Sequence, residues 1–190
     1  MKRHLLLLTV GACFVLHSAM AATNLLSIHL VVEKVFPQWH PGSMPKPDSL
    51  TLVSPPVLAD GDFVSFDATN QTFTITPGAA RRLAAGLRGG AAPILLNGGV
   101  YDQIPDTAPF VLQAAGEPIY VGAFYTLVSS SAFAGPVILP DTMFISPHLT
   151  NNVTFRIELG YPGTSPGLAD PRRDPRIVAA VQKLFAHEKK

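Results

Sequence analysis

The sequence predicts a mainly β domain, sandwich- or barrel-like and antiparallel, with an α+β fold as the alternative. Short apolar runs are separated by turn signals at a spacing of roughly ten residues, as in sandwiches and barrels. All 18 prolines follow the N-terminal apolar run, and so many prolines disfavour long helices. The stretch from Glu117 to Val128 is apolar on both faces, which is typical of a strand covered on both sides.

The N-terminus has the layout of a secretory signal peptide. Lys2 and Arg3 precede an apolar run that is too short to span a membrane, and Ala19-Met20-Ala21 follows as a cleavage pattern. We expect residues 1–21 to be removed. Cys13, the single cysteine, would leave with them, so the mature chain would hold no disulfide. This favours a bacterial periplasmic or secreted protein; a eukaryotic secreted protein is the alternative.

The mature chain is nearly neutral. The signal holds two of the 14 basic residues and none of the 13 acidic ones, so the remainder carries −1 (12 − 13). This balance argues against binding to nucleic acid or to an anionic membrane surface. No further apolar run is long enough for a transmembrane helix in the mature chain.

Alternation and turn residues place the other elements. Thr76 and Pro77 predict a helix start, a capping hydroxyl followed by proline at the first helical position, with the helix over 79–87. The segment 104–109 is expected to be a loop. Val121 and Phe155 are expected in one β core. The other strands are expected at 27–36, 50–54, 63–66, 71–76, 94–96, 100–101, 110–113, 137–139, 143–145 and 153–159.

The composition changes after Gly160. We expect a β domain over 22–160, a Pro/Gly-rich linker over 161–175 and an amphipathic helix over 176–190. The apolar stripe of that helix consists of Ile177, Val178, Val181, Leu184 and Phe185. A helix this short is marginal alone in water, so the stripe must be buried on its own sheet, on a partner, on a second copy or on a membrane surface.

Two His/Met pairs suggest a metal site. His40 and Met44 lie in one proline-rich segment, and Met143 and His148 lie in another. Imidazole and thioether ligands together suit copper, especially Cu(I). The alternative is that Met143 packs in the core and His40 lies in a loop.

Other known catalytic patterns are missing from the sequence. It contains no Gly-x-Ser-x-Gly elbow, no His-Glu-x-x-His and no Walker-type phosphate loop. A hydrolase would need scattered residues to converge, such as His148, Asp141 and a serine from 129–131. No motif identifies a family.

The sequence therefore favours an exported, non-catalytic binding or assembly module that acts through protein–protein contacts. Trp39 lies among aromatic and proline residues, a composition that binds sugars or peptides or else plugs the end of a sandwich. Trp39, Ile177, Val181, Leu184 and Phe185 are the candidate contacts for a partner or for self-association. A copper carrier and a hydrolase are the alternatives.

Overall fold

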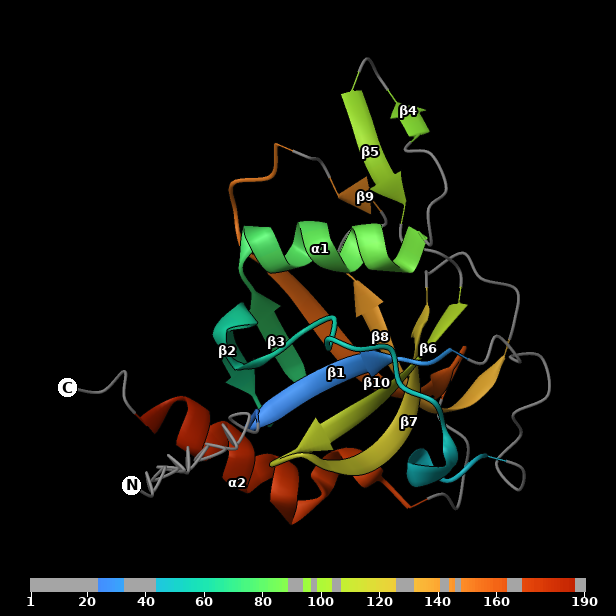
Figure 1. The fold of residues 1–190 in the computed structure, drawn as a ribbon, viewed down its shortest axis with the longest axis vertical. Coiled ribbons are helices and arrows are strands. Elements are labelled where there is room, and N and C mark those ends of the chain that lie inside the picture. Colours follow the sequence, from blue (N-terminus) through green and yellow to red (C-terminus); the bar gives the residue numbers. More distant parts are fainter. Residues whose placement is uncertain are drawn as a thin grey trace, which may run out of the picture.

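The fold is mainly β, as the sequence predicts. A computed structural model describes residues 24–32, 44–88, 94–96, 99–103, 107–125, 132–140, 144–145, 148–163 and 169–186. Within them, a seven-stranded mixed sheet, a three-stranded sheet and two short α-helices form a sandwich-like body with a C-terminal helix (Figure 1). The expected signal peptide lies outside these residues.

The large sheet has the strand order β1-β6-β7-β8-β10-β3-β2. Its strands are β1 (Leu26–Leu30), β2 (Phe63–Asp67), β3 (Thr72–Ile75), β6 (Thr107–Ala114), β7 (Glu117–Tyr125), β8 (Phe133–Pro140) and β10 (Val153–Tyr161). The small sheet consists of β4 (Ile94–Leu96), β5 (Gly99–Gln103) and β9 (Phe144–Ile145). Neighbouring strands are antiparallel except β7 and β8, which run parallel, so the sheet is mixed.

Turn chemistry fixes two hairpins of the large sheet. Between β2 and β3, the Asp67 carboxylate accepts hydrogen bonds from the backbone N–H groups of Thr69 and Asn70, which lowers the pKa of Asp67. Between β6 and β7, a two-residue turn places Ala115 at φ 52° and Gly116 at φ 81°. Positive φ at both positions matches the right-handed twist of the flanking strands.

Both helices begin where the sequence predicts. The Thr76 hydroxyl accepts a hydrogen bond from the Ala79 N–H at 3.2 Å, at the start of α1 (Pro77–Arg88). The Asp174 carboxylate accepts one from the Arg176 N–H at 2.9 Å, at the start of α2 (Pro175–Leu184). Both oxygens satisfy N–H groups that have no partner within the helix. Three short 3-10 turns complete the described elements: η1 (Pro47–Ser49), η2 (Asp60–Asp62) and η3 (Pro171–Arg173).

The large sheet curves around its main core. In Figure 1, β1 lies in front of β10, α1 lies at one end and α2 at the other. The core between them takes side chains from all seven strands and from both helices. Phe73 and Phe155 stack in it with ring centroids 5.4 Å apart. Ile177 and Ala180 of α2 belong to the same core, so the helix stripe docks on its own sheet except at Val178, which is 39% exposed.

The outer edge of β1 is covered by the chain that follows it. The Val53 N–H donates to the Leu30 carbonyl at 2.8 Å, and the Ile28 N–H donates to the Leu58 carbonyl at 2.9 Å. The Asp60 carboxylate then accepts hydrogen bonds from the N–H groups of Leu25 and Leu26. The segment that leads into β2 therefore stays attached to β1, and the two edge strands of the sheet are tied together.

β7 is buried on both faces, as its sequence predicts. Phe124 is 0% exposed on the face toward the helices, and Val121 is 4% exposed on the opposite face. The expectation that Val121 shares a core with Phe155 is wrong. Val121 packs with Val31 and Val111 on the outer face of the sheet, because successive side chains of a strand point to opposite sides.

Two segments expected to be irregular carry structure. β6 begins at Thr107, inside the expected loop 104–109, because its pairing with β7 extends to Thr107 and Tyr125. The second half of the expected linker forms η3, whose Arg172 guanidinium donates to the Ile157 carbonyl of β10 at 2.8 Å.

Candidate binding pocket between β7 and β8

The parallel pairing of β7 and β8 is short, and proline explains where it stops. The ladder joins Ala123 to Val137 and Phe124 to Ile138. The next residue of β8 toward the N-terminus is Pro136, which has no N–H to donate to a neighbouring strand. The two strands are therefore unpaired before this point, and each pairs only with its other neighbour, β6 or β10.

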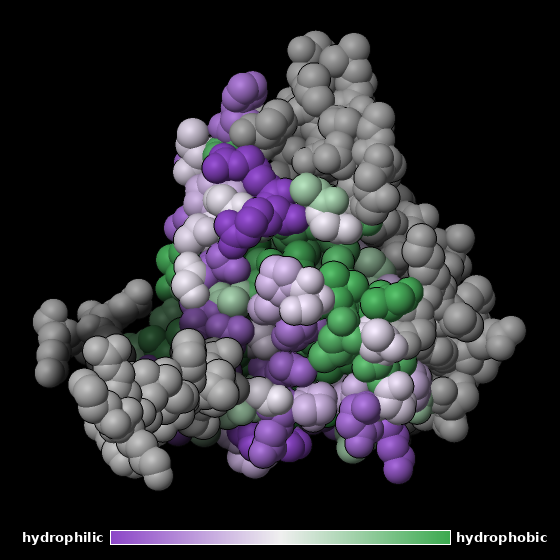
Figure 2. Space-filling view, in the orientation of Figure 1, coloured by the Kyte–Doolittle hydropathy of each residue, from purple (hydrophilic) through white to green (hydrophobic). Residues whose placement is uncertain are grey.

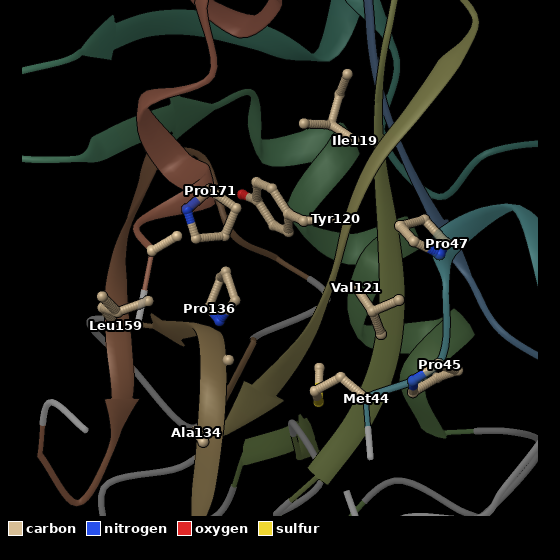
Figure 3. Close-up of a pocket in the computed structure, with 12 residues that line it drawn as sticks. Met44, Pro45, Pro47, Ile119, Tyr120, Val121, Ala134, Pro136, Leu159 and Pro171 are labelled. Carbon is tan, nitrogen blue, oxygen red and sulfur yellow. The ribbon is translucent and has the colours of Figure 1, made fainter. Parts of the chain in front are cut away.

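A pocket of about 230 Å³ lies where β7 and β8 separate. Its wall is formed by these strands, by Leu159 of β10 and by two segments, 44–47 and 169–171 (Figure 3). The lining side chains are apolar apart from the phenol of Tyr120. Ligand pockets typically combine such a lining with a few polar groups.

Gly135 makes room for the methionine that forms one side of the pocket. A Cβ atom at position 135 would lie 2.8 Å from Cε1 of Phe133 and 3.1 Å from Cε of Met44. Both contacts are shorter than ordinary van der Waals contacts, so a side chain here would displace Met44. The glycine allows the Met44 thioether to lie against the sheet beside Val121 (Figure 3).

The hydroxyl of Tyr120 is a buried polar group without a hydrogen-bond partner. Tyr120 is 4% exposed, and its ring packs edge-on against Phe110 at a centroid distance of 6.2 Å. Burial raises the pKa of Tyr120, so the group stays a neutral donor. Figure 3 places the hydroxyl beside Pro171, at the rim formed by the segment 169–171.

The neighbouring charges satisfy each other. Arg172 donates from Nε and from one Nη to the two carboxylate oxygens of Asp170, both at 2.8 Å, and this pairing lowers the pKa of Asp170. The side chains of Arg172 and Asp170 are 15% and 22% exposed. Because this pair is neutral and fully engaged, it offers no free charge to the pocket.

The described lining of the pocket is made of apolar residue types and one phenol. Among the described residues that line it, none carries a carboxylate, imidazole, amine or thiol. A general base must lie within hydrogen-bond reach of the proton it takes, and the described part of the lining holds no such group. What the pocket offers is apolar contact and one hydroxyl donor.

The residues of the predicted copper site are only partly described. His40 and Met143 lie outside the described residues. Met44 packs on the outer face of the sheet, whereas Leu149, next to the exposed His148, packs on the inner core near α1. Among the described residues, no group of three or more His, Cys, Asp or Glu could hold a metal. The copper site stays a prediction.

The other predicted site residues differ in how far they can be placed. Asp141, Ser129–Ser131 and Trp39 lie outside the part of the chain that the structure describes. His148 is exposed in a turn. On α2, Ile177 is 3% exposed, and Val181, Leu184 and Phe185 pack partly buried against the main core. As partner contacts, these four residues stay a prediction. Ile177 is buried, so a partner could touch only the exposed parts of Val181, Leu184 and Phe185.

An apolar patch marks the surface over β1. Figure 2 shows hydrophobic side chains gathered over this strand and the segment 50–58. Val32 and Val53 are 55% and 40% exposed there. Exposed apolar residues are common on protein surfaces, and nothing among the described residues shows what would cover this patch.

Sequence reasoning missed the pocket. A signal was available in Gly135-Pro136 inside an apolar run, since this pair predicts a break in a strand ladder. The sequence did not reveal that β7 would be the neighbour of β8 at this break, and the pocket depends on that pairing.

Comparison with known proteins adds no relative: no family model, curated protein or solved structure matches the chain. In the described residues, no helix has the length and apolar character needed to cross a membrane.

Proposed function

We propose that this protein is an exported, non-catalytic binding module that takes an uncharged apolar molecule into the pocket between β7 and β8. The observation that carries the proposal is the apolar lining of a pocket built from three strands and two separate segments. Export rests on the N-terminal sequence and predicts a secreted form that begins at Ala22, which an intact-mass measurement checks.

The size of the pocket favours a small molecule. A buried apolar cavity of about 150 Å³ holds benzene, so 230 Å³ corresponds by proportion to a ligand of about nine non-hydrogen atoms. An apolar side chain of a partner protein could fill the pocket in the same way as a small apolar molecule. We favour the free molecule because the helix stripe expected to recruit a partner packs on its own sheet.

The test is the binding of α-methylstyrene, an uncharged apolar probe of about this size, by ligand-detected saturation-transfer NMR. We expect Kd on the order of 0.1–1 mM, since burying an apolar surface of this size contributes roughly 5 kcal/mol. Ala169→Phe places a large side chain at the rim of the pocket and should abolish binding.

The matched control is Ala179→Phe, at an exposed position on the outer side of α2. This variant should bind the probe as the wild type does. Two results would contradict the proposal: absence of binding to the wild-type protein, or equal loss of binding in both variants. If a peptide with an apolar side chain binds the wild-type protein while free molecules do not, the occupant is a partner protein and the proposal is wrong.

A further inference from the structure

The pocket contains one feature that apolar binding does not explain, namely the Tyr120 hydroxyl. A buried hydroxyl without a hydrogen bond is unfavourable, and nearly all buried polar groups in native proteins are paired. A phenylalanine at position 120 would keep the edge-on contact with Phe110 and would remove the unpaired group. The hydroxyl is therefore a cost to the ligand-free fold.

The surroundings of the hydroxyl leave its hydrogen free. The neighbouring Arg172 donates from two guanidinium nitrogens to Asp170, and its third guanidinium nitrogen donates to the Ile157 carbonyl. The phenol remains protonated, because burial disfavours its anion. The Tyr120 hydroxyl is thus a neutral hydrogen-bond donor without an acceptor.

The Tyr120 ring belongs to the main core, and its hydroxyl lies toward the rim of the pocket. Pro171 lies beside it in Figure 3, and both Pro171 and Ala169 line the pocket. Ala169 is exposed, so this rim faces solvent on its other side. A small outward shift of the segment 169–171 would open the hydroxyl to an occupant of the pocket.

We propose that the ligand of this pocket carries a hydrogen-bond acceptor, such as a ketone, ester or amide carbonyl, on its apolar body, and that Tyr120 recognises this acceptor when the rim at 169–171 moves aside. The inference rests on the proposed function and narrows its ligand class. A neutral acceptor fits better than an anion, since each guanidinium nitrogen of Arg172 already donates, to Asp170 or to the Ile157 carbonyl.

Two isosteric probes separate the acceptor from the apolar body. Acetophenone and α-methylstyrene have the same size and shape, and only the former has a carbonyl oxygen. One hydrogen bond between neutral groups corresponds to a difference of about tenfold in Kd. We expect wild-type protein to bind acetophenone about tenfold more tightly, and Tyr120→Phe to bind the two probes equally.

The same variant gives a second readout that a merely structural tyrosine would not produce. Tyr120→Phe should keep or raise the midpoint of thermal unfolding while it loses the preference for acetophenone. If both probes bind wild-type protein equally, Tyr120 is a packing residue and this inference is wrong, although the apolar pocket stands. If neither probe binds, the proposed function fails as well.

Discussion

Gly122 is the residue where β6 and β7 come closest. It lies directly opposite Phe110 in the ladder, and the Phe110 ring crosses over it to reach Phe124 at a centroid distance of 5.2 Å. A Cβ atom at position 122 would lie 2.3 Å from Cζ of Phe110 and 2.7 Å from the Pro136 carbonyl oxygen. An aromatic ring opposite a strand glycine compensates for the missing side chain.

Gly122→Ala should therefore destabilise the fold. The added methyl group must displace the buried Phe110 ring and the backbone at Pro136, and overpacking of this kind costs about 1–3 kcal/mol in the free energy of unfolding. Gly61→Ala is the control, because a Cβ there has no neighbour within 4 Å. Urea denaturation of both variants checks the prediction; equal stabilities would show that the ring moves freely.

At the scale of elements, the sequence predicted those features that depend only on residues close together in the chain. The strand around Phe155 and the cap at Thr76 both follow from local chemistry, and each is present. The parallel pairing of β7 with β8 was not predictable, because it depends on which distant strands meet. The pocket was missed for the same reason, since Tyr120 and Leu159 approach only through that arrangement.

The β6–β7 hairpin contains one residue in an unfavourable conformation. Ala115 has φ 52°, the left-handed region in which a Cβ atom is crowded by the backbone. Ala115→Gly removes this crowding and should raise the free energy of unfolding by about 0.5–1 kcal/mol. Ala68→Gly, in the exposed β2–β3 turn, should give no gain, and chemical denaturation compares the two. A gain at both positions would mean that the effect is not specific to the left-handed residue.

At the scale of the whole molecule, buried phenols on the two faces of the sheet make the fold sensitive to alkaline pH. Burial, with Tyr161 beside it, raises the pKa of Tyr125 to about 12, and burial also raises the pKa of Tyr120. An unfolded chain loses its phenol protons near pH 10. The stabilising contribution of Tyr125 is therefore complete below about pH 10 and is lost as the pH rises to about 12.

We expect the free energy of unfolding to fall by about 2 kcal/mol or more between pH 10 and pH 12. In Tyr125→Phe the free energy of unfolding should fall less over this interval than in the wild type. At pH 8 the variant should be no more stable than the wild type. Denaturant titrations at several pH values measure both quantities. An unchanged pH dependence in Tyr125→Phe would mean that this phenol titrates normally.

The strand order also determines when the chain can fold during its synthesis. β1 pairs with β6, through Leu26 and Ala114, and β3 pairs with β10, through Ile75 and Val153. β1 can therefore pair only once β6 has emerged, and β3, although β2 lies beside it, lacks its second neighbour until β10 has been made. Sheets dominated by such distant pairings fold in milliseconds to seconds rather than microseconds. During that interval the free edge of β3 and the apolar face that β10 later covers remain accessible, and surfaces of this kind are where an incomplete chain is most prone to aggregate.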